Sequence, residues 1–208
     1  MKLLGLTGNI ACGKSTVASL LRERGAGVLD ADQLVHELYS DRKFAAQVAA
    51  LFGAGVLDEQ GRVERKALSS LVFGDAAALR RLELLVHPAV AELRAEKLRA
   101  FEDLHEPPTV VVLEAVKLLE SGQARGCAAV WCVTCTSELQ LQRLIKTRGL
   151  SEVEARARLE LQPPPEAKRR IADELQVPLI EIRNDGTPEE LATQVQTLWN
   201  DFCPAQSL

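Results

Sequence analysis

The side chains best suited to chemistry lie near the start of the chain, in a loop that matches the pattern G-x-x-x-x-G-K-S. Small residues in such a loop let backbone N–H groups wrap phosphates, and the following helix presents its positive end to them. Lys14 would reach the β- and γ-phosphate oxygens of ATP, and Ser15 would offer its hydroxyl to Mg²⁺. The predicted ATP-binding residues are Gly8, Asn9, Ile10, Ala11, Cys12, Gly13, Lys14, Ser15 and Thr16.

Two carboxylates follow the second apolar run at alternate positions, in Asp30-Ala31-Asp32. The carboxyl end of a parallel strand opens on the crevice where ligands bind. A carboxylate there can orient an attacking hydroxyl and accept its proton, and we prefer Asp32 for this role. A structural alternative stays open, in which Asp30 caps the next helix and Asp32 is a first-turn acid.

Further charged side chains fall near other predicted strands. Glu114 ends an apolar run and is placed either to support Mg²⁺ through water or simply to be solvated. Arg143 and Arg148 follow the fourth predicted strand, where guanidinium groups would neutralise a transferring phosphate. For either arginine alone, a salt-bridged helix face is an equal explanation. His87 is more typical of a packing residue than of a catalyst.

The elements that must position these residues alternate in type along the chain. Short apolar runs alternate with longer segments of helical periodicity, which predicts an α/β fold with a parallel sheet covered by helices on both faces. A helix is predicted over 15–24, directly after the phosphate loop, and Gly25 stops it. The predicted strands are 2–6, 27–29, 109–113, 128–133 and 179–182.

We expect one kinase-like domain over 1–208 that carries an insertion and a lid. Residues from about 41 to 106 have apolar positions at helical spacing, which indicates an inserted helical lobe. His87-Pro88 is expected to restart or kink a helix inside it. Residues from about 148 to 170 are charged and contain Pro163-Pro164-Pro165, which cannot lie inside a helix. We interpret that irregular segment as a mobile lid.

Composition excludes several other classes of protein. The chain is 47% hydrophobic with a formal charge of -4, so it has no basic surplus for binding nucleic acid. The apolar run after Met1-Lys2 is too short for a signal peptide or a membrane span, which leads us to expect a cytoplasmic protein that avoids membranes. Five scattered cysteines argue against a disulfide framework. Cys132 and Cys135 form C-x-x-C, but they should point to opposite faces of a strand, so we expect neither metal binding nor redox chemistry there.

The loop alone does not decide what is done with the nucleotide, because switches, motors and kinases share it. An N-K-x-D guanine-reading motif and an L-S-G-G-Q-like motif are absent from the sequence, which favours a small-molecule kinase. The main alternative among enzymes is a kinase for nucleoside monophosphates or for another small hydroxyl compound. A phosphate acceptor would need arginines near the paired aspartates, and the nearest is Arg42, which favours a hydroxyl acceptor. A nucleotide-dependent switch remains the alternative from another class.

A series of motifs in order along nearly the whole chain is more specific than the loop. They are Gly5-Leu6-Thr7-Gly8-Asn9, Val28-Leu29-Asp30-Ala31-Asp32 with His36, Leu71-Val72-Phe73, Leu82-Glu83, His87-Pro88, Gln142-Arg143, Arg148-Gly149-Leu150-Ser151, Gln162, Ala172-Asp173 and Asn184-Asp185-Gly186-Thr187. Taken together, they resemble the dephospho-coenzyme A kinase family, whose members are P-loop small-molecule kinases.

The resemblance implies transfer of the ATP γ-phosphoryl group to the ribose 3′-hydroxyl of dephospho-coenzyme A, with Mg²⁺, in the last step of coenzyme A synthesis. It implies that Lys14 clamps phosphate, that Asp32 is the base and that Arg143 lies near the phosphates or adenine. The helical insertion would receive the acceptor, and the segment after Arg148 would be the lid, with Arg148 on the ATP side. The expected acceptor-binding residues are Asp30, Asp32, His87 and Pro88.

Two departures from the family pattern concern details of the site. The segment Glu114–Glu120 lacks the proline and phenylalanine that the family commonly has there. A longer segment, 174–183, replaces the usual short strand before Asn184. The resemblance therefore leaves acceptor contacts near 114–120 and the adenine end of the site open.

Overall fold

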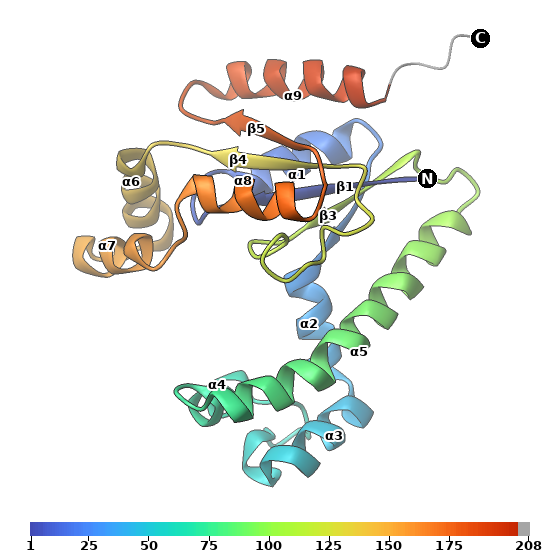
Figure 1. Ribbon diagram of the computed structural model, residues 1–208, viewed down its shortest axis with the longest axis vertical. Coiled ribbons are helices and arrows are strands. Elements are labelled where there is room, and N and C mark those ends of the chain that lie inside the picture. The colour runs from blue at the N-terminus through green and yellow to red at the C-terminus, as the bar shows by residue number, and fades with distance from the viewer. Residues whose placement is uncertain (204–208) are drawn as a thin grey trace. The chain divides into compact units, whose positions relative to one another are not determined.

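A computed structural model describes residues 1–203 of the chain, in which strands and helices alternate (Figure 1). Its elements are β1 (Lys2–Gly8), α1 (Lys14–Glu23), β2 (Gly27–Asp30), α2 (Ala31–Ser40), α3 (Arg42–Phe52), the short 3₁₀ helix η1 (Ala54–Val56), α4 (Arg65–Val72), α5 (Ala76–Glu102), β3 (Val110–Glu114), β4 (Ala129–Thr134), α6 (Ser137–Arg148), α7 (Glu152–Glu160), α8 (Pro165–Glu174), β5 (Leu179–Arg183) and α9 (Pro188–Phe202). Among these helices, none is long and apolar enough to cross a membrane.

The strands form one sheet in the order β2-β3-β1-β4-β5, with β1 in the middle. β1 pairs in parallel with β3 and β4, and β4 pairs in parallel with β5. Each strand lies where the sequence predicts one, because strands covered on both faces are continuous apolar runs. The predicted α/β class is confirmed.

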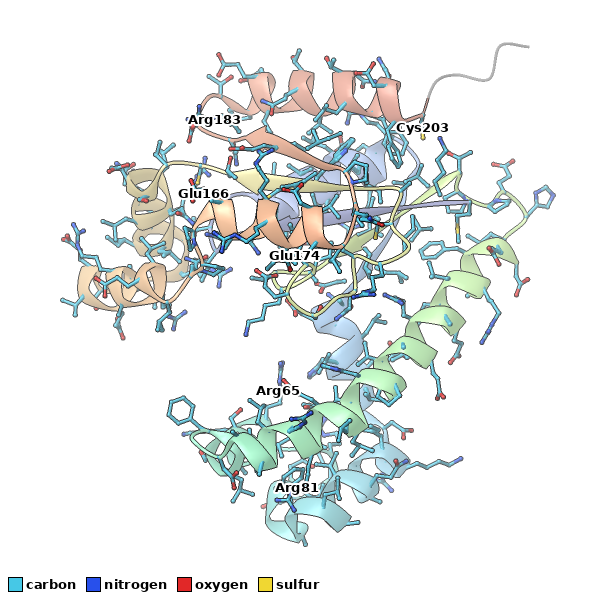
Figure 2. All side chains as sticks on the ribbon, in the orientation of Figure 1. Arg65, Arg81, Glu166, Glu174, Arg183 and Cys203 are labelled. Atoms are coloured by element: carbon cyan, nitrogen blue, oxygen red, sulfur yellow. The ribbon has the colours of Figure 1, made fainter. Side chains whose placement is uncertain are left out.

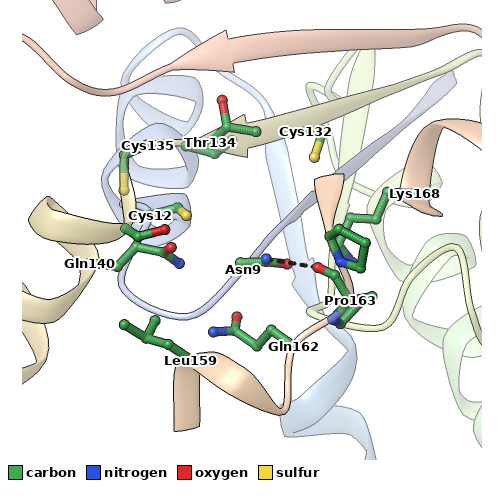
Figure 3. Close-up of a pocket in the computed structure, with 13 residues that line it drawn as sticks. Asn9, Cys12, Cys132, Thr134, Cys135, Gln140, Leu159, Gln162, Pro163 and Lys168 are labelled. Carbon is green, nitrogen blue, oxygen red and sulfur yellow. Dashed lines mark hydrogen bonds between the residues drawn. The ribbon is translucent and has the colours of Figure 1, made fainter. Parts of the chain in front are cut away.

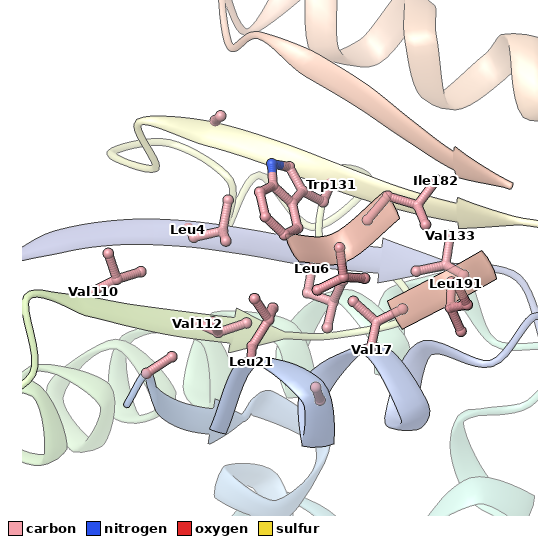
Figure 4. Packing of buried hydrophobic residues seen from close by; sticks show 14 of the residues in the cluster. Leu4, Leu6, Val17, Leu21, Val110, Val112, Trp131, Val133, Ile182 and Leu191 are labelled. Carbon is pink, nitrogen blue, oxygen red and sulfur yellow. The ribbon is translucent and has the colours of Figure 1, made fainter. Parts of the chain in front are cut away.

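One face of the sheet packs against α1 and α9 (Figure 4). Alternate strand residues, such as Leu4 and Leu6 of β1, point to this face, as the period of two requires. Trp131 of β4 is fully buried there and meets the ring of Phe202 edge-on, with centroids 6.2 Å apart. This packing fixes α1, and therefore the phosphate loop that precedes it, against the sheet.

The opposite face is covered by the segment after β3 and by α8, which lies in front of the strands in Figure 1. Gly5 makes room for this layer, since a Cβ there would lie 2.7 Å from Leu118 Cδ2 and 2.9 Å from Val130 Cγ2. Lys168 of α8 is 2% exposed, and its Nζ donates to the Val116 carbonyl at 3.0 Å and to Glu120 Oε1 at 2.7 Å. The predicted three layers are therefore present.

The chain divides into two compact units, residues 1–28 with 106–208 and residues 29–105. The second unit is helical and has its own core, formed around Phe44, Val48 and Leu82. Its helices begin at acidic caps, such as Asp75, whose Oδ1 accepts from the N–H groups of Ala77 and Ala78. Of the restart or kink expected at His87-Pro88, the restart is wrong, because α5 runs through Pro88 as one helix of 27 residues. The kink stays a prediction.

The segment from about 148 to 170 is more regular than expected. It contains α7 and the start of α8, which is marked at Glu166 and Glu174 in Figure 2. Ser151 opens α7 with a capping box that it shares with Glu154. Pro165 is the first residue of α8, a position where a missing N–H costs nothing. The proline triplet therefore separates two helices and enters no helix interior.

Candidate active site

The phosphate loop joins β1 to α1 and has the backbone shape that phosphate binding needs. Gly13 is the N-cap of α1 with φ 94°, and no side chain caps this helix end. A Cβ at Gly13 would lie 2.1 Å from Asn184 Nδ2, so only glycine fits. Ala11 also has a positive φ, of 59°. The uncapped N–H groups at the start of α1 form a site for an anion.

The carbonyl groups of the loop are held from outside by side chains. Three consecutive carbonyl oxygens each accept a hydrogen bond from a residue that is distant in sequence. The bonds run from Gln140 Nε2 to Ile10 at 2.8 Å, from Arg143 Nη1 to Ala11 at 3.3 Å and from Asn184 Nδ2 to Cys12 at 2.8 Å. Bonds that fix these carbonyls also fix the orientation of the peptide planes, and with it the direction of the N–H groups.

Lys14 pairs with Glu114 at the end of β3. The Nζ and Oε1 atoms lie 2.6 Å apart, and the two side chains are 16% and 8% exposed. The pair lies beside the loop because β3 is a neighbour of β1 in the sheet. Glu114 is therefore a partner of the loop lysine, rather than the solvated strand end that the sequence left open.

Ser15 and Thr16 occupy the first turn of α1, and both are exposed. The described part of the chain holds no cluster of His, Cys, Asp or Glu that would cage a metal ion. Mg²⁺ in nucleotide sites is commonly held by one or two protein ligands together with phosphate oxygens, so it needs no such cage. One exposed hydroxyl at Ser15, beside an anion site, fits that mode of binding.

The two predicted arginines differ in their surroundings. Arg143 is half-buried on α6, and its guanidinium bridges the carbonyl oxygens of Ala11 and Asn184 through Nη1 and Nη2. Arg148 is exposed in the last turn of the same helix. The structure thus places Arg143 against the phosphate loop and Arg148 at the end of α6, where the segment that we expect to be the lid begins.

The junction between α7 and α8 touches the loop and closes one side of a cavity (Figure 3). Gln162 Oε1 accepts from the Ile10 N–H at 2.6 Å, and Asn9 Nδ2 donates to the Pro163 carbonyl at 3.3 Å. The cavity has a volume of about 280 Å³. Its lining includes Cys12 from the phosphate loop, Cys132 from β4 and Cys135, which follows β4.

The strand period predicts that Cys132 and Cys135 point to opposite faces of the sheet. Cys135, which follows the end of β4 at Thr134, packs against the core cluster on the α1 and α9 face, whereas Cys132 is not part of that cluster. Both residues nevertheless line the cavity at the end of β4. Burial raises the pKa of the Cys132 thiol to about 11.

The predicted acceptor-side residues lie in the second unit, residues 29–105. Asp30 Oδ1 accepts from the N–H groups of Asp32 and Gln33 at 2.8 and 3.2 Å, so it caps α2 as the structural alternative proposed. Asp32 is exposed in the first turn of α2, and its carboxylate forms no hydrogen bond or ion pair with the described residues. His87 and Pro88 are exposed in the middle of α5.

Several residues at the loop were not among those chosen from the sequence. Gln140 and Asn184 are buried amides, and no local pattern distinguishes such a residue from an ordinary polar one. Gln140 lies three positions before Arg143, which puts both on one face of α6. Gln162 and Asn184 belong to the quoted motifs, but their partners on the loop become visible only in the fold.

The segment that departs from the family pattern is well anchored. The Val116 carbonyl oxygen accepts from Thr7 Oγ1 and from Lys168 Nζ, both at 3.0 Å. Lys168 also pairs with Glu120. The loss of the proline and phenylalanine is thus accompanied by hydrogen bonds to β1 and α8.

Comparisons with known proteins agree on one family. A family model described as dephospho-CoA kinase matches residues 2–187. The dephospho-CoA kinase of Geobacter sulfurreducens is 40% identical over 200 residues, which cover 96% of this chain and 98% of that protein. The crystal structure of TT1252 from Thermus thermophilus has a TM-score of 0.78 at 34% identity and covers 97% of this chain and 98% of its own. The dephospho-CoA kinase from Campylobacter jejuni, 23% identical with a TM-score of 0.67 over 97% and 98% of the two chains, shares the fold.

Proposed function

This chain belongs to the dephospho-CoA kinase family, and from that premise we propose which of its residues perform the reaction. The enzyme transfers the γ-phosphoryl group of ATP to the ribose 3′-hydroxyl of dephospho-CoA, giving CoA and ADP in the last step of CoA biosynthesis. The observation that carries the assignment of the donor site is the phosphate loop with its uncapped helix end. A nucleoside monophosphate as acceptor is not favoured.

The phosphate loop holds the donor. The N–H groups from Gly13 to Ser15 at the start of α1 would bind the phosphate oxygens, and the other predicted ATP-binding residues, Thr16 included, would shape the cradle. Gln140, Arg143 and Asn184 support this role because they fix the carbonyl groups behind it. Transfer of a phosphoryl group depends mostly on positioning and charge stabilisation, which a rigid cradle supplies.

Lys14 changes partner when ATP binds. In the structure its Nζ pairs with Glu114, which keeps a mostly buried ammonium compensated. In the complex Nζ would bind β- and γ-phosphate oxygens and would follow the charge that moves to the bridging oxygen. Ser15 would hold Mg²⁺, which supplies charge neutralisation across the β- and γ-phosphates.

Asp32 is our choice for the base. Its carboxylate would accept the proton of the ribose 3′-hydroxyl while the hydroxyl oxygen attacks the γ-phosphorus and the bond to the β,γ-bridging oxygen breaks. An exposed carboxylate without a partner in the described chain supports Asp32 over Asp30, whose Oδ1 is engaged in capping α2. Asp30 would then position the start of α2 beside the acceptor.

Arg143 and Arg148 belong to the donor side of the proposal. Arg143 uses two guanidinium N–H groups on carbonyl oxygens, which supports a role in positioning the loop near the phosphates. Other N–H donors of the guanidinium remain to meet phosphate or adenine. Arg148 would approach ATP from the lid, which we assign to residues 148–170.

The helical insertion, about 41–106, is proposed to receive dephospho-CoA. His87 and Pro88 support this assignment because they are exposed on α5, where packing does not explain them. We also assign the enzyme to the cytoplasm, a reducing compartment that suits a chain whose Cys12, Cys132, Cys135 and Cys203 are thiols.

The test is ADP release from Mg-ATP with and without dephospho-CoA. The wild type is expected to release ADP only when the acceptor is present. Asp32→Asn should lower kcat by about 100-fold or more, because a general base contributes about 10² to 10⁴. ATP should bind this variant normally.

Asp30→Asn is the matched control, since asparagine caps helices as well as aspartate does. This variant should keep most of its activity. A larger loss in Asp30→Asn than in Asp32→Asn would move the base to Asp30. ADP release that does not depend on dephospho-CoA would contradict the assignment of dephospho-CoA as the substrate.

A further inference from the structure

Two cysteines from distant parts of the sequence meet beside the phosphate loop. Cys12 is a loop residue and is 2% exposed, whereas Cys135 directly follows β4 and is half-buried. Both line the cavity of Figure 3, and Cys135 packs against the buried cluster that contains Cys12. Cys135 Sγ also lies 4.0 Å from the carbonyl oxygen of Ala11, the neighbour of Cys12. The geometry therefore places two cysteines beside each other at the backbone of the phosphate loop.

The two thiols are not equivalent. The neighbouring Cys12 thiol lowers the pKa of Cys135, and the guanidinium of Arg143 lowers it further, against the opposing effects of burial and Asp185. The neighbouring Cys135 thiol and burial raise the pKa of Cys12. Cys135 also lies just ahead of the N-terminus of α6, an environment that favours a thiolate. Cys135 is thus the more nucleophilic sulfur, and Cys12 is its protonated neighbour.

We propose that Cys12 and Cys135 form an oxidation site, in which a peroxide joins them in a disulfide that disables the phosphate loop. The Cys135 thiolate attacks one peroxide oxygen, so an S–O bond forms and the O–O bond breaks, giving a sulfenic acid and hydroxide. Cys12 sulfur then attacks the sulfenic sulfur, which forms the S–S bond and breaks the S–O bond. Two thiols and one hydrogen peroxide yield one disulfide and two waters. A dithiol reverses the change by exchange.

The disulfide would act on the loop because covalently bonded sulfur atoms are much closer than two separate thiols that only pack against each other. A disulfide requires about 2.05 Å between sulfurs. Cys12 is flanked by Ala11 and Gly13, whose conformations are left-handed, and its own carbonyl oxygen is held by Asn184. Pulling its side chain toward Cys135 therefore strains or shifts the N–H groups at the start of α1. This consequence rests on the proposed role of the loop in ATP binding.

The test begins with the reduced full-length enzyme. Hydrogen peroxide should lower acceptor-dependent ADP release about tenfold or more, since displacements of about 1 Å at a site can cost about 100-fold. A peptide map by mass spectrometry should show a link between the peptides of Cys12 and Cys135. Dithiothreitol should remove the link and restore the rate.

Variants separate this site from the other thiols. Cys135→Ser should retain its basal rate and resist peroxide. Cys203→Ser is the matched control, because Cys203 is also half-buried but lies at the C-terminal end of α9 (Figure 2). Peroxide should lower the activity of this variant as much as it lowers that of the wild type.

Three results would overturn the proposal: inactivated wild type without the link, a link without loss of activity, or full sensitivity in a folded Cys135→Ser variant. The peptide map of the wild-type enzyme tests the proposed disulfide even if the Cys135→Ser variant misfolds. Absent turnover in the reduced enzyme would instead contradict the proposed function, while the map still reports on the disulfide.

Discussion

At the scale of single residues, the site depends on partners that hold the loop before any substrate arrives. Lys14 pairs with Glu114, and buried amides from Gln140 and Asn184 bind loop carbonyl oxygens. Pre-formed contacts of this kind lower the cost of ordering a site when ligand binds. Individual side chains outside the loop motif therefore determine how well the motif works.

The Lys14–Glu114 pair gives the first prediction of stability. Glu114→Ala should lower the free energy of unfolding by about 3 kcal/mol, because it leaves a mostly buried ammonium without its partner. Urea denaturation followed by circular dichroism measures this difference.

Glu37→Ala is the control for that experiment. Glu37 pairs with Lys97 at 2.7 Å, but the side chains are 52% and 36% exposed. An exposed pair contributes about 0 to 1 kcal/mol. Equal losses in the two variants would contradict the importance of burial at Glu114.

At the scale of elements, the segment 148–170, our proposed lid, is joined to the phosphate loop by hydrogen bonds from a short junction. Gln162 and Pro163, between α7 and α8, bond to Ile10 and Asn9. A movement of the junction is therefore coupled to the backbone of the loop. The hydrogen bonds between the junction and the loop are present without bound substrate.

Gln162→Ala should raise the KM for ATP by about two- to tenfold, because a net hydrogen bond contributes about 0.5 to 1.5 kcal/mol. The value of kcat should change little. Steady-state kinetics at saturating dephospho-CoA measure both constants. Gln60→Ala, an exposed glutamine in the second unit, is the control. An unchanged KM in Gln162→Ala would mean that the junction does not support the loop.

The centre of the sheet makes a prediction about packing. Gly5→Ala should lower the free energy of unfolding by about 1 to 3 kcal/mol, because its Cβ would overpack Leu118 and Val130. Gly55→Ala is the control, since a Cβ there meets nothing within 4 Å. Thermal denaturation compares the two, and a destabilisation as large in Gly55→Ala would contradict the assignment to crowding.

Elements with strong local patterns were predictable, and those that depend on tertiary context were not. The five strands follow from apolar runs, and α1 follows from its place after a glycine-rich loop. At Pro88 the sequence left a restart or a kink open, because proline removes a helix hydrogen bond, and only the fold shows that α5 does not restart there. The helices α7 and α8 were missed because charge and prolines obscure their periodicity.

At the scale of the whole molecule, sheet order explains why the site could be predicted only in part. β1 lies between β3 and β4, and β5 follows β4, so the residues after these strands converge at one edge. Lys14 is identifiable from its motif. Asn184, by contrast, contacts the phosphate loop only because β5 ends beside that loop. Sequence spacing does not encode that neighbourhood. The roles of Asp32, His87 and Pro88 stay predictions.

The most direct test of the central claim is identification of the product. The enzyme is incubated with Mg-ATP and dephospho-CoA, and the products are followed by phosphorus NMR and mass spectrometry. The account predicts one ADP for each CoA, with a new phosphomonoester resonance coupled to the ribose 3′ proton. ADP without CoA, or phosphate on any other hydroxyl of the acceptor, would contradict it.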